Sequence, residues 1–177
     1  MDSGNIGFVL LCAAFVFVMT PGLAMFYGGL VRKKNVVNTM MTSIFIIGIG
    51  IVMWVLFGYS LSFAPSGNAF IGDFRWLGLE GVSLTEGYTD GASIPNMVFS
   101  AFQMMFAVIT PALITGAVAG RMKFKSIFVF TIFWSLIVYY PLAHMVWNGG
   151  LLSADGAISQ AIGAAAHDFA GGTVVHI

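Results

Sequence analysis

The stretch TPGLAMFYGGLVRKKN, residues 20–35, ends a long apolar run with Arg32, Lys33 and Lys34. The apolar residues before it reach back to about Ile6, far enough for a helix to cross the ~30 Å hydrocarbon core of a bilayer. The rest of the sequence has the same character, because 59% of its 177 residues are hydrophobic, 8% are charged, and the mean hydropathy is +0.95. Soluble domains are rarely so apolar. We therefore predict an all-α integral membrane protein.

Four apolar stretches are long enough to span a membrane, and a fifth begins near the end of the sequence. The first is not preceded by Lys or Arg and exceeds the length of a signal-peptide core, so we expect a retained helix. Long polar loops separate the second stretch from the third and the fourth from the fifth. We predict a single transmembrane domain over residues 1–177, with helices at about 6–31, 36–63, 93–120 and 127–147, and a truncated helix from 168 onward.

The basic residues indicate the orientation of the chain. Six of the seven lie in two short connections, residues 32–34 and 121–125, and Arg75 is the exception. Cytoplasmic loops of membrane proteins carry an excess of Lys and Arg. We therefore expect both connections in the cytoplasm, and the N-terminus, the long loops and the start of the fifth helix outside.

Composition also excludes several classes of function. The formal net charge is +0, so the sequence predicts no basic surface for nucleic acid. The lone Cys12 can form neither an internal disulfide nor a cysteine-based metal site. We expect no metal and no cofactor.

Asp168 stands at the external start of the fifth apolar stretch, DFAGGTVVHI. A carboxylate there can accept hydrogen bonds from unpaired N–H groups as a helix N-cap. The same charge lowers the energy of a cation arriving at the outer mouth of a pathway. The two roles are compatible.

His176 lies eight residues further on, which is ~12 Å along a regular helix and close to the middle of the bilayer. Ionisable groups at this depth usually face a protein interior or a pathway. Packing within the helix bundle is the alternative role. Helical spacing also puts Asp168 and His176 ~80° apart, so we interpret them as successive points on a path.

Aromatic side chains complete the predicted external site. Phe102 and Phe106 are four residues apart on one helix face, and Trp147 ends the fourth apolar stretch. Aromatic faces attract cations by about 0.5 to 2 kcal/mol. Each ring can instead serve packing or the interfacial aromatic belt.

Four motifs resemble the ammonium transporters of the Amt/Mep/Rh type. They are TPGLAMFYGGLVRKKN (residues 20–35), FQMMFA (102–107), AHMVW (143–147) and DFAGGTVVHI (168–177). The resemblance implies an eleven-helix inverted-repeat fold, assembled as a homotrimer in the cell membrane, with the N-terminus outside. The chain looks like the five-helix N-terminal half, and the resemblance implies that the second half is needed for transport.

By the same resemblance, Phe106 and Trp147 form the aromatic wall of an external ammonium site, with Phe102 one turn further out. Asp168 shapes that site, and His176 is the first of two pore histidines that can bind ammonia or relay a proton. The resemblance thus implies recruitment of NH4+ at this vestibule and passage through a narrow apolar pore, without enzymatic chemistry. The connection 121–125 corresponds to the region that meets cytoplasmic PII-type regulators, although topology alone also explains its charges.

Two other functions remain open from the sequence. A membrane sensor could bind ammonium without moving it. A haem-binding redox protein could use His144 and His176 as ligands, although Trp147 and Asp168 would then have no role.

Overall fold

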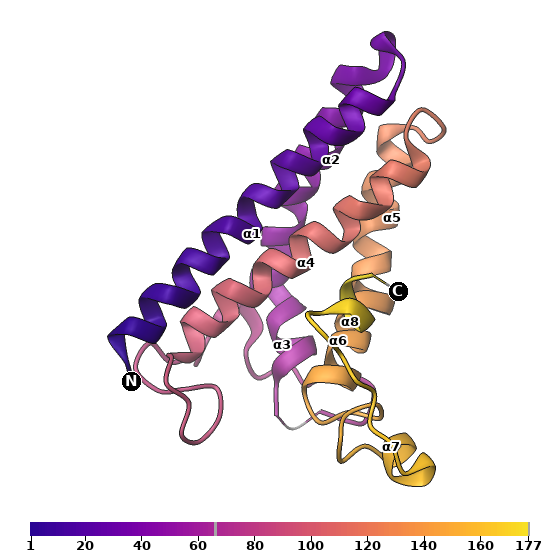
Figure 1. The fold of residues 1–177 in the computed structure, drawn as a ribbon. Coiled ribbons are helices and arrows are strands. Elements are labelled where there is room, and N and C mark those ends of the chain that lie inside the picture. Colours follow the sequence, from indigo (N-terminus) through magenta and orange to yellow (C-terminus); the bar gives the residue numbers. More distant parts are fainter. Residues whose placement is uncertain (66, 177) are drawn as a thin grey trace. The chain divides into compact units, whose positions relative to one another are not determined.

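Four long apolar helical segments dominate the computed structural model, which describes residues 1–65 and 67–176 (Figure 1). They cover Ser3–Leu30, Lys33–Phe63, Asn96–Val118 and Phe124–Trp147. These bounds lie within three residues of the ranges expected from the sequence. Within the described residues no β-strand occurs, and Gly87 and Pro95 form an isolated bridge. The expected all-helical membrane fold is confirmed.

Shorter elements subdivide and connect these segments. Two of them, η2 and η4, are π-helical turns inside longer helices, a feature that is frequent at functional sites. The elements in chain order are α1 (Ser3–Leu30), η1 (Lys33–Asn35), α2 (Val36–Met53), η2 (Trp54–Gly58), α3 (Tyr59–Phe63), η3 (Leu77–Leu79), α4 (Asn96–Val118), α5 (Phe124–Trp134), η4 (Ser135–Tyr139), α6 (Tyr140–Trp147), α7 (Ala157–Ile162) and α8 (Gly172–Val175).

The first of two compact units comprises Met1–Val52 and Val82–Ile132. In it α1 packs along α4, and the Tyr27 hydroxyl donates a hydrogen bond to the Leu113 carbonyl at 3.0 Å. Between α2 and α4, the hydroxyls of Ser43 and Thr115 are 2.9 Å apart and both side chains are buried. Polar side chains thus join helices whose outer faces are apolar.

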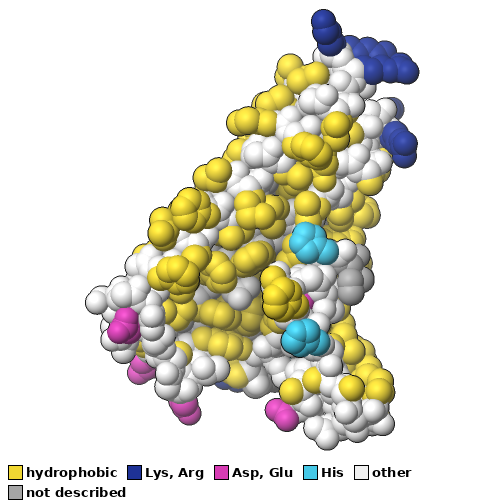
Figure 2. Space-filling model, in the orientation of Figure 1, with side chains coloured by type: hydrophobic (Ala, Val, Ile, Leu, Met, Phe, Trp, Pro, Cys, Tyr) yellow, Lys and Arg dark blue, Asp and Glu magenta, His cyan; other side chains and the backbone are white. Residues whose placement is uncertain are grey.

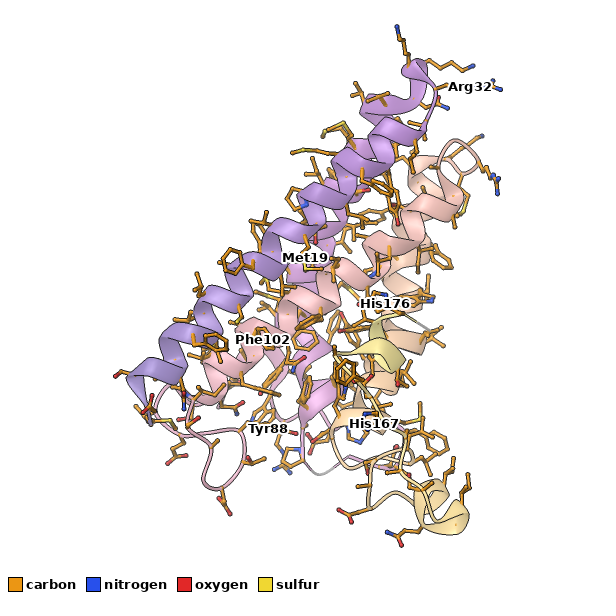
Figure 3. The ribbon with its side chains drawn as sticks, viewed as in Figure 1. Met19, Arg32, Tyr88, Phe102, His167 and His176 are labelled. Carbon is orange, nitrogen blue, oxygen red and sulfur yellow. The ribbon has the colours of Figure 1, made fainter. Side chains whose placement is uncertain are left out.

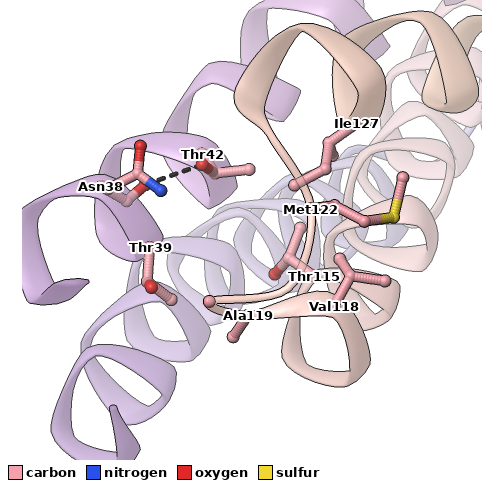
Figure 4. A pocket seen from close by; sticks show the side chains of 9 residues that line it. Asn38, Thr39, Thr42, Thr115, Val118, Ala119, Met122 and Ile127 are labelled. Carbon is pink, nitrogen blue, oxygen red and sulfur yellow. Dashed lines mark hydrogen bonds between the residues drawn. The ribbon is translucent and has the colours of Figure 1, made fainter. Parts of the chain in front are cut away.

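A small pocket lies in this unit beside α2 and α4 (Figure 4). Its volume of about 10 Å³ is the space that one water molecule needs. The Thr39, Thr42 and Thr115 side chains line it together with apolar groups. The buried Thr39 hydroxyl has no hydrogen-bond partner within the described chain.

The second unit comprises Met53–Gly81 and the described residues from Phe133 on. Here α3 packs against α6, and Gly58 at the end of η2 faces the Tyr140 ring. A Cβ added to Gly58 would lie 2.7 Å from Tyr140 Cζ, so a larger residue does not fit without movement of a buried ring. A loop of this unit carries Asp168 beside Trp147 at the end of α6.

Candidate functional site

Trp147 and Asp168 form the centre of the candidate site in the second unit. The indole Nε1–H at the end of α6 donates to Asp168 Oδ2 at 2.5 Å. The other carboxylate oxygen, Oδ1, accepts from the backbone N–H of Thr173 at 2.7 Å. One carboxylate therefore connects the end of α6 to the start of α8. These two predicted site residues are brought together.

The environment of Asp168 keeps its carboxylate ionised. Partial burial by itself would raise its pKa. Hydrogen bonds from the Trp147 indole and from the backbone and side chain of Thr173, and the charge of His167, act in the opposite direction and bring the pKa below the ordinary value of 3.8. A fixed negative charge therefore lies beside the indole near neutral pH.

An aromatic column fixes the plane of the Trp147 ring. Trp147 stacks on Phe63 with centroids 6.2 Å apart and an interplanar angle of 14°. Phe63 stacks in turn on Tyr59, and Tyr59 on Trp76. Phe63 and Tyr59 are almost fully buried, so this column anchors the half-buried indole from one side. The ring at the site is held by packing as well as by its hydrogen bond.

The start of the last helix differs from the sequence prediction. Helix α8 begins at Gly172, with Gly171 as its N-cap, so the prediction that a helix begins at Asp168 is wrong. Ala170 and Gly171 have φ angles of 52° and 77°. Residues in this left-handed conformation do not continue a right-handed helix. The Asp168 carboxylate still accepts the N–H of Thr173 in the first turn of α8, so its predicted capping interaction is present from outside the helix.

His176 follows the last residue of α8 and is exposed (Figure 3). Because residues 168–171 are not helical, the estimate of ~12 Å from Asp168 along a regular helix does not apply. The predicted angle of ~80° between Asp168 and His176 around a helix does not apply for the same reason. Its role in a pore stays a prediction.

Phe102 and Phe106 belong to the first unit and lie one turn apart on α4, and Phe102 is labelled in Figure 3. Their rings meet edge to face, with centroids 5.1 Å apart and an interplanar angle of 84°. Both side chains are half-buried. The expected helical neighbours are therefore a direct aromatic pair, a geometry that is favourable beyond burial alone.

His144 is buried in α6, one turn before Trp147, and its ring is fully engaged. Nε2 lies 2.8 Å from the Asn68 carbonyl oxygen, and Nδ1 lies 3.1 Å from the Asn148 amide nitrogen and 3.2 Å from the Ser62 carbonyl oxygen. A neutral ring with its proton on Nε2 donates to Asn68 and accepts from Asn148. Neither nitrogen is then free to bind a metal, which argues against the haem alternative.

Sequence reasoning missed two residues that hold the site. Phe63 supports the Trp147 ring, and Thr173 binds the Asp168 carboxylate. The spacing of Tyr59 and Phe63, four residues apart on a helix, was a signal for a stacked pair. No local sequence signal connects Phe63 to Trp147, because they lie in separate helices, whereas Thr173 is near Asp168 in the chain and its contact is the capping interaction predicted for Asp168.

Comparisons with known proteins agree with the motifs. The sequence model described as the Ammonium Transporter Family matches residues 7–177. The chain is 49% identical to the ammonium transporter of Bacillus subtilis and 42% identical to that of Aquifex aeolicus, with 100% of the chain covered in both cases. These alignments cover 41% and 40% of the two relatives, so the chain spans about two-fifths of their length.

Solved structures show the same relationship. The chain matches the crystal structure of Saccharomyces cerevisiae Mep2 with a TM-score of 0.81 at 34% identity, covering 99% of this chain and 39% of that one. The crystal structure of Candida albicans Mep2 gives a TM-score of 0.81 at 29% identity, with 99% and 36% covered.

Proposed function

Because the chain belongs to the ammonium transporter family, we propose that the protein containing it moves ammonium or ammonia across the cell membrane. The observation that carries the proposal is the hydrogen bond from the Trp147 indole to the Asp168 carboxylate. It combines an aromatic face with a fixed negative charge, which together suit a small cation.

The external step is recruitment of NH4+ at Trp147. A cation over an aromatic face gains about 0.5 to 2 kcal/mol, and more when it loses water. When the indole N–H donates to a carboxylate, the electron density of the ring increases. The ring face then attracts a cation more strongly. Both Asp168 oxygens already accept hydrogen bonds, so Asp168 acts through the ring and through its charge. We assign Phe106, with Phe102 beside it, to the same recruitment step.

The second step is passage of the neutral molecule. Ammonium and potassium have similar size and charge, but only ammonium can lose a proton and donate directional hydrogen bonds. An unhydrated charge in an apolar pore is costly, so such a pore favours NH3. We assign His176 to this pore, where a neutral imidazole can accept one hydrogen bond and donate another.

The resemblance to the same family supports a proposal for the assembly and its surroundings. We propose a homotrimer in the cell membrane, with the N-terminus outside and the basic connections in the cytoplasm. The connection around Arg121 is then positioned to meet a PII-type regulator. Cysteines placed at the exposed positions Lys33 and Ala154 in a Cys12→Ala background test the orientation. An impermeant reagent should label only the cysteine at 154 in intact cells, and labelling only at 33 would reverse the topology.

Flux through liposomes containing the full-length protein tests the transport proposal. Trp147→Leu and Asp168→Asn should lower ammonium flux, whereas Trp134→Leu, a matched aromatic change outside the proposed site, should not. His176→Ala should alter flux or its discrimination against potassium while leaving assembly and thermal stability nearly unchanged. A wild-type protein that binds ammonium and carries none would be a sensor, and the transport proposal would be wrong.

A further inference from the structure

The two basic connections of the first unit border a cleft of about 620 Å³. A volume of this size is within the range of small-molecule sites. Figure 2 shows the Lys and Arg side chains gathered at these connections, which follow α1 and α4. The lining includes Leu30, Arg32, Lys34, Asn35, Gly120 and Arg121.

The backbone brings the two connections together at Gly120. This residue has a φ of 70°, a conformation that glycine adopts without strain, and it follows the C-cap of α4. A Cβ at this position would lie 3.1 Å from the side-chain amide nitrogen of Asn35. The close approach places Arg121 on the same cleft as the residues that follow α1.

The charge of the cleft is positive and uncompensated. Arg32, Lys34 and Arg121 line it, and none of the other described residues in the lining carries a carboxylate. None of these three side chains forms an ion pair with another described residue. All three are exposed, so a ligand can approach them directly. An anion is therefore the class of ligand that the cleft attracts.

The cleft lies at the C-terminal end of α1, and this position favours a membrane lipid as the source of the anion. A helix of 28 residues is ~42 Å long, which exceeds the ~30 Å hydrocarbon core and places an end among lipid headgroups. Leu30, which lines the cleft, is 69% exposed, and Met25 and Phe26 before it are 64% and 61% exposed. Within this chain an apolar surface thus adjoins the basic groups. A lipid can occupy both, with its phosphate at the cations and its chains along α1.

We propose that this cleft binds the phosphate group of an anionic glycerophospholipid from the cytoplasmic leaflet. Guanidinium and ammonium groups at the ends of membrane helices bind such headgroups, and the adjoining acyl chains add apolar contact. Free phosphate shares the charge but lacks the chains, so it binds more weakly. The proposal does not depend on ammonium transport.

Native mass spectrometry of the detergent-purified full-length protein tests the site, with dioleoylphosphatidylglycerol and dioleoylphosphatidylcholine as probes. The variant Arg32→Gln/Lys34→Gln/Arg121→Gln removes three charges from the cleft. The matched variant Lys33→Gln/Lys123→Gln/Lys125→Gln removes three charges from the same connections but from outside the cleft lining. The first should lower affinity for phosphatidylglycerol by at least about tenfold, and the second by less than about twofold.

The wild-type protein should also prefer phosphatidylglycerol to phosphatidylcholine, and millimolar inorganic phosphate should not displace the lipid. Equal loss in the two triple variants would show diffuse attraction to all six charges, and the proposed site would be wrong. Displacement by inorganic phosphate would show a site for a small anion only. Loss of regulator binding in the cleft variant, with unchanged lipid affinity, would assign the cleft to a protein partner instead. Melting temperatures in phosphatidylcholine verify that both variants are folded.

Discussion

Trp147 donates its indole N–H to the carboxylate of Asp168, 21 residues later in the sequence, at 2.5 Å. The same carboxylate accepts the backbone N–H of Thr173 and so holds the first turn of α8. Asp168 is therefore a positioning residue for a ring and a helix start at once. This double role lets capping and recruitment be separated by experiment.

The charge and the hydrogen-bond acceptors of Asp168 can be removed in two steps. Asp168→Asn keeps one acceptor oxygen, whereas Asp168→Ala leaves the N–H groups of Trp147 and Thr173 without this partner, at roughly 1–2 kcal/mol of stability. We expect both variants to lose ammonium flux, and only the alanine variant to melt at a clearly lower temperature. The control Asp155→Asn changes an exposed acid in the preceding loop and should be neutral in both assays. Normal flux in Asp168→Asn would leave capping as the only role.

The pKa of Asp168 predicts how stability depends on pH. The folded pKa is lower than the ordinary 3.8, so the ionised carboxylate stabilises the fold at every pH above that ordinary value. This contribution should disappear as the pH falls below 3.8 and through the folded pKa. The difference in melting temperature between wild type and Asp168→Asn should be constant near neutral pH and shrink only in that acidic window. A difference that shrinks already at pH values well above 3.8 would contradict the assignment.

His144 should be a structural residue. His144 is buried, and removal of its ring opens a cavity and takes one hydrogen bond each from the Asn68 carbonyl and the Asn148 amide, so His144→Ala should cost roughly 2–4 kcal/mol of stability. His167→Ala is the matched control, because His167 is exposed, and its effect should stay within about 0.5 kcal/mol. Thermal melting of the purified variants measures both. Equal stability of the two variants would mean that the His144 network contributes nothing.

The contact between Gly58 and Tyr140 predicts a steric effect. Gly58→Ala would press a methyl group against the buried Tyr140 ring and should destabilise the protein by roughly 1–3 kcal/mol. Gly48→Ala is the control, since a Cβ there meets nothing within 4 Å and alanine favours a helix by up to about 1 kcal/mol. Melting temperatures should therefore move in opposite directions. A neutral Gly58→Ala would show that the ring yields easily.

The sequence by itself determined the class of fold and the helices that build it. Hydropathy sums over about twenty neighbouring residues, so a run such as that ending at Leu30 is visible without knowledge of any contact. The motifs around Trp147 and Asp168 likewise pointed to the family that the comparisons show. These signals are local in the chain, and that is why they can be read from it.

Tertiary structure alone decided which groups meet. His144 binds Asn68 from 76 positions away, and Phe63 stacks under Trp147, contacts that no local pattern encodes. The last segment shows the same limit, because the left-handed Ala170 and Gly171 delay α8 to Gly172. Apolar composition predicted a helix from Asp168. The left-handed conformation of Ala170 and Gly171 prevents a helical turn there, so the helix begins later. Local composition fixes the tendency to form helices, whereas turns and distant contacts depend on how the folded chain satisfies its polar groups.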